Sequence, residues 1–246
     1  MENERYIRRV DFSNKAKRVP VCFCIDTSHS MGFIDPKLGG YKVVNPGKTV
    51  YVDQTVAGYV EGGTTYIEEV MDGIKKFYEA ILDDDIACDA CECAIVTFND
   101  SPKLYEGFDT VDNKTVPDLS NEPKGNTNVT PALEMCLDLL EKQKQFYKSN
   151  RIGYYQPWLV VFSDGLATDD VSRIQYRLMN LQDNEKLTVY TMALSEDAEL
   201  LNHLNGYSKK RPIVCRDART IKKFFDFLAK SVSITAGDGT PDDFEF

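Results

Sequence analysis

Short apolar runs that alternate with longer amphipathic stretches are the feature that most limits what this chain can fold into. Five runs are rich in β-branched or aromatic residues, at 19–25, 93–98, 158–162, 187–194 and 213–215. Most are apolar at every position, which is typical of strands in a mostly parallel sheet that helices cover on both faces. A shorter run at 104–108 predicts an edge strand. We therefore expect an α/β fold with a doubly wound, mostly parallel central sheet, helices on both faces and one short antiparallel edge strand.

Amphipathic stretches between these runs predict the helices. The clearest covers residues 67–82, where apolar side chains recur at three- and four-residue steps and Thr65 with Glu68 forms a capping box. A second helix is expected from about Pro131 to Lys148, with the proline at the first helical position, where an amide hydrogen is not needed. Three more are expected at residues 171–181, 198–204 and 221–232. This order favours a layered domain with right-handed crossovers.

The alternation is interrupted at residues 33–63, a glycine-rich stretch with a strand-like segment at 48–52. It is too long for an ordinary connection, so we expect either an inserted hairpin or a mobile functional loop. The predicted organisation is a basic N-terminal extension at 1–18, one domain at 19–232 that carries this insertion, and an acidic C-terminal tail at 233–246. The extension is expected to be a solvated arm, with docking onto an acidic surface as the alternative.

Composition excludes several classes of function. The chain has 29 Lys and Arg against 39 Asp and Glu, a formal net charge of −10, so neither nucleic acid nor an anionic membrane is an expected partner. No apolar run approaches the roughly 18 residues of a membrane span, and residues 1–9 do not resemble a signal peptide.

Seven cysteines cannot all pair within one chain. We interpret them, including the pairs Cys22 with Cys24 and Cys91 with Cys93, as core thiols of a cytoplasmic protein.

Oxygen-bearing side chains follow the predicted strands at three places. Asp26, Ser28 and Ser30 alternate in the turn after the first strand, an arrangement that a helix cap alone could also explain. Thr127 lies in a loop before the second expected helix, and Asp164 follows the fourth strand. Ligands of doubly wound sheets bind outside the carboxyl ends of strands, which would bring Asp26 and Asp164 face to face. Two carboxylates and three hydroxyls, without sulfur or imidazole, suit Mg²⁺ or Mn²⁺ better than zinc.

This pattern, Asp-x-Ser-x-Ser followed by a Thr and then by Asp-Gly, resembles the metal-ion-dependent adhesion site of the von Willebrand factor A (VWA) domain, which lies on a Rossmann-like sheet. The matching residues are Asp26, Ser28, Ser30, Thr127 and Asp164. The resemblance covers roughly residues 18–232 and departs at 33–63, because relatives usually enter the first helix almost directly. Residues 156–170 are particularly similar to bacterial TerY-like members from tellurium-resistance operons.

The resemblance implies a non-enzymatic, metal-ion-dependent protein-binding module, in which hydroxyls ligate the metal directly and aspartates often act through water. Mg²⁺ is the expected ion, with Mn²⁺ or Ca²⁺ as alternatives. An ion held mainly by neutral hydroxyls keeps positive charge, so it attracts an Asp or Glu side chain of a protein partner. The TerY-like features imply a bacterial stress-response assembly, and residues 33–63 are expected to form a rim that selects the partner.

The alternative is a metal-dependent phosphohydrolase of the haloacid-dehalogenase type, which also begins with Asp on the first strand. That chemistry normally needs an acidic residue two positions later, where this chain has Ser28, and a hydroxyl cannot replace a tuned carboxyl in proton transfer. The two histidines do not predict a hydrolase: His29 is expected to be a solvent-facing loop residue and His203 a structural one. We therefore assign no catalytic residue.

Overall fold

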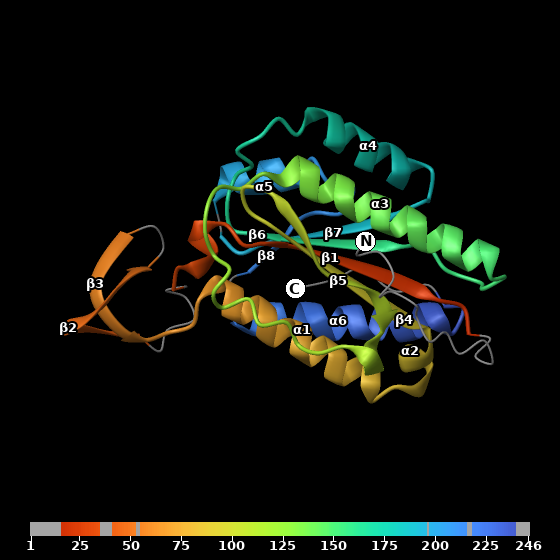
Figure 1. Ribbon diagram of the computed structural model, residues 1–246, viewed down its shortest axis with the longest axis horizontal. Helices are drawn as coiled ribbons and strands as arrows, with labels where there is room; N and C mark the ends of the chain where they lie inside the picture. Colours follow the sequence, from red (N-terminus) through yellow and green to blue (C-terminus); the bar gives the residue numbers. More distant parts are fainter. Residues whose placement is uncertain (1–15, 35–40, 53–54, 196, 216–217, 240–246) are drawn as a thin grey trace, which may run out of the picture.

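A six-stranded sheet forms the centre of the molecule, with strand order β5-β4-β1-β6-β7-β8 (Figure 1). The structure is a computed structural model that describes residues 16–34, 41–52, 55–195, 197–215 and 218–239, and of residues 41–61 and 218 only the backbone. The strands are β1 (Val19–Asp26), β4 (Cys91–Phe98), β5 (Pro102–Thr110), β6 (Trp158–Ser163), β7 (Thr188–Ala193) and β8 (Ile213–Val214). Only the β4–β5 pair in this sheet is antiparallel. The predicted fold class is confirmed.

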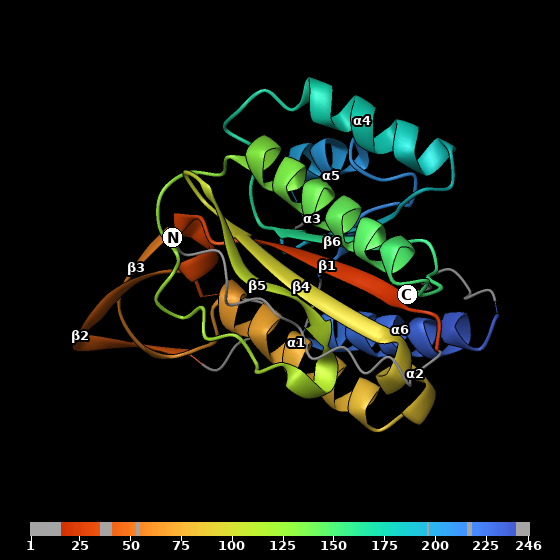
Figure 2. The ribbon, with the colours of Figure 1, turned by 45° about the vertical axis from the view of Figure 1, so that its right-hand side comes forward.

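Helices cover both faces of this sheet (Figures 1 and 2). They are α1 (Tyr66–Leu82), α2 (Asp85–Ala90), α3 (Val129–Ser149), α4 (Ser172–Asp183), α5 (Ala198–Asn205) and α6 (Ala218–Ala236), with short 3-10 turns η1 (His29–Gly32) and η2 (Val111–Asn113). Helices α1, α2 and α6 lie on one face, and α3, α4 and α5 on the other. Within the described residues, no helix combines the length and the apolar character that a membrane crossing requires.

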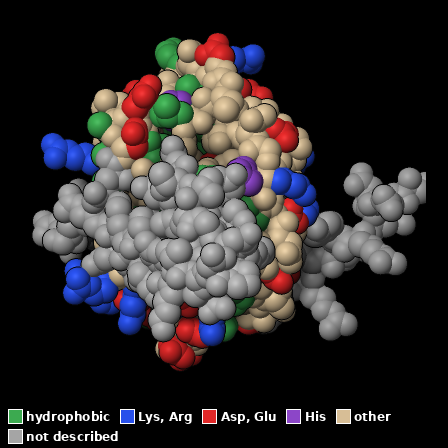
Figure 3. Space-filling view, turned by 90° about the vertical axis from the view of Figure 1, so that its left-hand side faces the viewer, with side chains coloured by type: hydrophobic (Ala, Val, Ile, Leu, Met, Phe, Trp, Pro, Cys, Tyr) green, Lys and Arg blue, Asp and Glu red, His purple; other side chains and the backbone are tan. Residues whose placement is uncertain are grey.

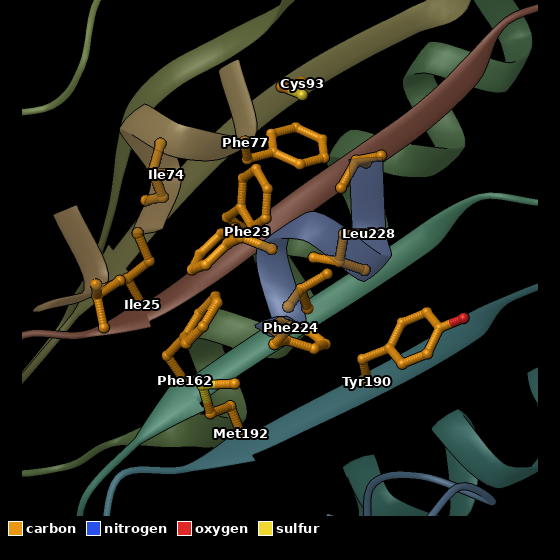
Figure 4. Close-up of a cluster of buried hydrophobic side chains, with 14 of the residues drawn as sticks. Phe23, Ile25, Ile74, Phe77, Cys93, Phe162, Tyr190, Met192, Phe224 and Leu228 are labelled. Carbon is orange, nitrogen blue, oxygen red and sulfur yellow. The ribbon is translucent and has the colours of Figure 1, made fainter. Parts of the chain in front are cut away.

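Each face of the sheet carries its own hydrophobic core, because alternate residues of a strand point to opposite sides. All eight residues of β1 are buried, as expected for a central strand covered on both sides. On the α1 and α6 face, aromatic rings fill the space between sheet and helices (Figure 4). Phe23 of β1 meets Phe77 of α1 edge to face, with ring centroids 5.5 Å apart, and Phe162 of β6 meets Phe224 of α6 at 6.1 Å.

Three helices differ from the sequence-based expectation. Helix α3 begins at Val129, so Pro131 is the third helical residue and not the first. Helix α2 was not predicted, because its six residues are too few to establish a period, although Asp84 caps it by accepting from Ala87 N. Helix α6 extends beyond the predicted 221–232 at both ends, so the predicted helix bounds are wrong: residues up to Ala236, within the predicted tail at 233–246, are helical.

The insertion predicted at 33–63 contains an antiparallel hairpin of β2 (Tyr41–Val52) and β3 (Thr55–Gly62), so the first of the two expected alternatives is correct. Figures 1 and 2 both show this hairpin standing away from the central sheet, beside η1 and the start of α1. Its two ends meet: Ile34 and Thr65 form an isolated antiparallel bridge, and Tyr66 N donates to Phe33 O at 3.2 Å. The hairpin therefore leaves and rejoins the domain at one point.

The last residues of the predicted basic extension are part of the folded domain. Arg18 is buried, its Nε lies 3.6 Å from Glu92 Oε1, and its guanidinium donates to Asp89 O. Lys17 donates to Asp238 at 2.6 Å. The expectation of a solvated arm is therefore wrong for Arg18, and residues 1–15 and 240–246, on which the rest of the extension and of the tail fall, lie outside the described residues.

Candidate metal-binding site

The carboxyl ends of β1 and β6 lie next to each other, as the sequence predicts. The two strands pair in parallel, and Ile25 is the register partner of Phe162. Asp26 ends β1, and Asp164 directly follows the last residue of β6, Ser163. Both aspartates therefore stand at the same edge of the sheet. Figure 3 views the molecule from the left-hand side of Figure 1, and acidic and basic side chains both appear around the periphery of that view.

Asp26 is completely buried, and both of its carboxylate oxygens accept hydrogen bonds. Ser28 N donates to Oδ1 at 2.7 Å, and Ser163 Oγ donates to Oδ2 at 2.7 Å. Burial raises the pKa of Asp26 to about 6, and the hydrogen bonds from Ser163 and Ser28 oppose this shift. The first bond holds the turn after β1, and the second joins it to β6.

A continuous row of oxygens connects three of the predicted site residues. Ser30 Oγ donates to Asp164 Oδ1 at 2.9 Å, and Ser28 Oγ lies 3.3 Å from Ser30 Oγ. The turn η1 brings Ser30 back toward β6, since Met31 N donates to Ser28 O at 3.1 Å and Phe33 N donates to Ser30 O at 2.8 Å. Ser28 and Asp164 are both buried.

Thr127 approaches the same edge from a different loop. It is buried, and a Cβ atom added to Gly165 would lie 3.9 Å from its hydroxyl oxygen, which places that hydroxyl next to the residue after Asp164. Its carbonyl accepts from Thr168 N at 2.9 Å. The structure therefore brings the loops that carry all five predicted residues to one edge of the sheet.

The donor set fits a hard divalent cation by its chemistry. It offers carboxylate and hydroxyl oxygens only, which Mg²⁺, Mn²⁺ and Ca²⁺ prefer, and a nearby dication would stabilise the charged form of the buried Asp26. Among the described residues, no group of three or more His, Cys, Asp or Glu side chains is arranged to hold a metal. Two carboxylates alone are too few ligands for such an ion. A metal bound here would therefore also need the hydroxyl oxygens of Ser28, Ser30 and Thr127.

Ser163 also lies at this site, although it is not one of the five predicted residues. Its hydroxyl lies 2.7 Å from Asp26 Oδ2 and 3.0 Å from Gly165 O, so it ties the end of β1 to the loop after β6. The available signal was its position beside Asp164 at the end of an apolar strand. Serines often end strands, so this position alone does not identify Ser163 as a site residue.

The other predicted residues are placed as follows. His29 is exposed, as expected, and its ring meets Phe33 edge to face at 5.3 Å. His203 is half-buried in α5 and lies 2.6 Å from the hydroxyl of Tyr207, which agrees with a structural role. All seven cysteines are described, and none forms a disulfide: Cys88 is partly exposed and the others are buried. The interpretation as core thiols is confirmed for those six.

The fold and this edge define the class of protein: a Rossmann-like α/β domain with clustered oxygen side chains at the carboxyl ends of its central strands. The sequence model of the von Willebrand factor type A domain matches residues 21–167, more than half of the chain. The chain therefore belongs to the VWA family. A search of curated proteins found no match.

Solved structures with a similar fold include proteins of pili and of a byssus. The PilB minor pilin of Streptococcus sanguinis has a TM-score of 0.58 and 14% identity, and the alignment covers 89% of this chain and 62% of that one. Proximal thread matrix protein 1 of the mussel byssus has a TM-score of 0.53 and 11% identity, with 89% and 49% covered. The vWF domain of the type V pili tip protein Mfa5 of Porphyromonas gingivalis has a TM-score of 0.55 and 12% identity, with 94% and 98% covered.

The chain thus spans less than two thirds of the first two neighbours and nearly all of the third domain. At these identities the similarity shows the fold alone. It supports the same fold for this chain. It does not identify the partners or the biological context of this chain.

Proposed function

We propose that this chain is a non-enzymatic protein-binding module whose partner offers an Asp or Glu side chain to a Mg²⁺ ion. The residues that would hold the ion are Asp26, Ser28, Ser30, Thr127 and Asp164. The observation that carries the proposal is the row of oxygens from Asp164 through Ser30 to Ser28, at the edge where β1 and β6 end. Membership in the VWA family, whose domains are usually adhesion or interaction modules, supports the same role.

The protein's own residues explain why an external acid is needed. Asp26 directs one oxygen to Ser28 N and the other to Ser163, so both of its oxygens already accept hydrogen bonds within the domain. The remaining donors are one carboxylate and three neutral hydroxyls. A bound Mg²⁺ would supply positive charge that these donors cancel only in part, and an incoming carboxylate is the natural complement.

The β2–β3 hairpin is the proposed selectivity element. The predicted insertion that contains it begins at residue 33, directly after η1, and Ile34 and Thr65 pair across the ends of this insertion. A partner that brings a carboxylate to the metal edge would meet this hairpin at the same time (Figure 1). The hairpin would then determine which acidic side chain can approach.

The cellular context is the part of the proposal that rests on sequence. None of the seven cysteines, all of which are described, forms a disulfide. This is compatible with a reducing compartment, so we propose a cytoplasmic location. Residues 156–170 resemble the TerY-like members of the family, which suggests a bacterial stress-response assembly of the tellurium-resistance type.

Isothermal titration of Mg²⁺ into the full chain tests the site directly. Thr127→Ala and Ser30→Ala should each weaken Mg²⁺ binding at least 10-fold without unfolding the domain. The matched control is Thr27→Val, because the Thr27 hydroxyl donates to Phe98 O and not to the predicted site. Equal affinities for the wild-type chain and both site variants would contradict the assignment.

Partner binding requires a second experiment. Affinity capture from native lysate in Mg²⁺ and in EDTA, with Ser28→Ala as the control bait, should recover a protein only when the ion and the serine are both present. Replacing residues 35–64 by a two-residue turn should keep Mg²⁺ affinity and lose that partner, since Ile34 and Thr65 already pair across the gap. A phosphatase and esterase screen with and without EDTA should show no turnover. Metal-dependent turnover that Asp26→Ala abolishes would favour the phosphohydrolase instead.

A further inference from the structure

Two aspartates outside the predicted donor set hold the loop that carries Thr127. Asp100, in the turn between β4 and β5, accepts from Asn126 N at 3.0 Å and from Asn126 Nδ2 at 2.9 Å. Gly125 has a φ of +71°, and a Cβ atom there would lie 2.3 Å from Asp100 Oδ2. The close approach of Asp100 to this loop therefore requires glycine, both for the backbone conformation and for the space.

Asp169, in the loop after β6, holds the other side of Thr127. Its two carboxylate oxygens accept separately from the first two amides of α3, Val129 N at 2.8 Å and Thr130 N at 2.9 Å. The N-cap residue, Asn128, makes no side-chain cap of its own. Asp169 therefore caps α3 from a loop 40 positions away, and its negative charge is favourable at a helix N-terminus.

Further hydrogen bonds join the same two loops. Thr168 N donates to Thr127 O at 2.9 Å, and Thr168 Oγ1 donates to Asn128 Oδ1 at 2.7 Å. Asp164 belongs to the same loop as Thr168. The position of Thr127 relative to Asp164 is thus set by the hydrogen bond of its own carbonyl and by contacts of the residues on both sides of it.

We propose that Asp100 and Asp169 are positioning residues of the metal-binding site, which hold Thr127 from two sides and act on the ion only through it. This inference rests on the proposed function. Mg²⁺ requires near-ideal geometry at about 2.0 to 2.1 Å, so a threonine on a freer loop is a poorer ligand. Loss of outer contacts of this kind typically lowers metal affinity about 10- to 100-fold.

The test compares Mg²⁺ affinity, by calorimetry, with stability in EDTA, by urea unfolding. Asp169→Ala and Asp100→Ala should each bind Mg²⁺ at least 10-fold more weakly than the wild-type chain. The matched control is Asp197→Ala, because Asp197 caps α5 by accepting from Glu199 N at 2.8 Å and Leu200 N at 3.0 Å. It should lose comparable stability and keep wild-type affinity. If Asp169→Ala does not fold, Thr168→Val removes one loop contact and should show a smaller loss of affinity.

A double variant separates positioning from a direct effect. In a Thr127→Ala background, Asp169→Ala should cause no further loss of Mg²⁺ affinity, because the residue through which it acts is already gone. If the wild-type chain binds Mg²⁺ and Asp169→Ala binds it with equal affinity, this inference is overturned and the proposed function is not. An equal loss of affinity in Asp197→Ala would also overturn this inference. A wild-type chain that binds no Mg²⁺ would overturn the proposed function and this inference with it.

Discussion

Ser163 donates a hydrogen bond of 2.7 Å to Asp26 and so connects the ends of two neighbouring strands that are 137 positions apart in the sequence. Ser163→Ala would leave a buried carboxylate oxygen without this donor. We expect a loss of about 1 to 3 kcal/mol in the free energy of unfolding. Mg²⁺ affinity should fall about 10-fold, because the orientation of Asp26 is no longer held. Urea unfolding and calorimetry measure the two effects.

The control for this prediction is Ser208→Ala. The Ser208 hydroxyl is also buried, and it donates to Val189 O at 2.6 Å, away from the predicted donors. This variant should lose stability without any change in Mg²⁺ affinity. If both variants keep wild-type affinity, Ser163 contributes to the fold and not to the site.

The buried carboxylate of Glu92 is expected to be one of the most sensitive positions of the fold. It lies 3.6 Å from Arg18 Nε and accepts from Gln143 Nε2 at 2.7 Å and from the Tyr147 hydroxyl. Glu92→Ala leaves the buried guanidinium of Arg18 without this carboxylate and should cost about 3 to 5 kcal/mol in the free energy of unfolding, measured in urea.

An exposed ion pair provides the comparison for Glu92. Glu122 lies 3.0 Å from Lys103 Nζ, and the lysine side chain is 57% exposed. Glu122→Ala should change stability by less than about 1 kcal/mol. Similar losses for Glu92→Ala and Glu122→Ala would mean that the buried pair contributes no more than a solvated one.

Gly73 of α1 lies directly against the Phe225 side chain of α6. A Cβ atom at this position would lie 2.1 Å from Cε2 of Phe225, whose ring is buried and stacks on Phe162 with centroids 5.5 Å apart. Overpacking of this kind typically costs about 1 to 3 kcal/mol, against about 1 kcal/mol gained in helix propensity. Gly73→Ala should therefore lower the urea midpoint. In a Phe225→Leu background the same change should cost less, and a stabilised Gly73→Ala chain would disprove the contact.

The ionisation of His203 gives a prediction about pH. Burial lowers the pKa of His203 below its usual 6.5, although the charge of Asp169 opposes the shift. The folded state therefore prefers the neutral ring: its contribution to stability is complete above pH 6.5 and is lost as the pH falls through the folded-state pKa. An NMR titration should show one of the two histidines titrating below 6.5, and the spectrum of His203→Gln identifies it. A midpoint at or above 6.5 would contradict the burial.

The sheet and the site could be predicted for different reasons. Strands such as β1 and β6 are apolar on both faces, so their burial is visible in the sequence itself. The site residues are separated along the chain. The rule that ligands bind at the carboxyl ends of strands brought Asp26 and Asp164 together with Thr127, and the family pattern matched the same residues. Helix α2 was missed because a short helix carries little periodicity.

The roles of Asp100 and Asp169 could not be predicted, because they depend on loop contacts. Asp100 bonds to a residue 26 positions away, and Asp169 bonds to amides about 40 positions away. Neither interaction leaves a local pattern, since any polar loop residue could occupy such a position. The start of α3 was misplaced for the same reason: its cap comes from another loop.

The bridge between Ile34 and Thr65 has an evolutionary consequence. Because the chain departs and returns at adjacent points, a hairpin of different length or composition could replace β2 and β3 while the oxygen donors and the helix that follows keep their places. Under the proposed function, partner specificity and Mg²⁺ affinity can then evolve separately. Transplanting this hairpin between relatives would transfer partner specificity and leave Mg²⁺ affinity unchanged.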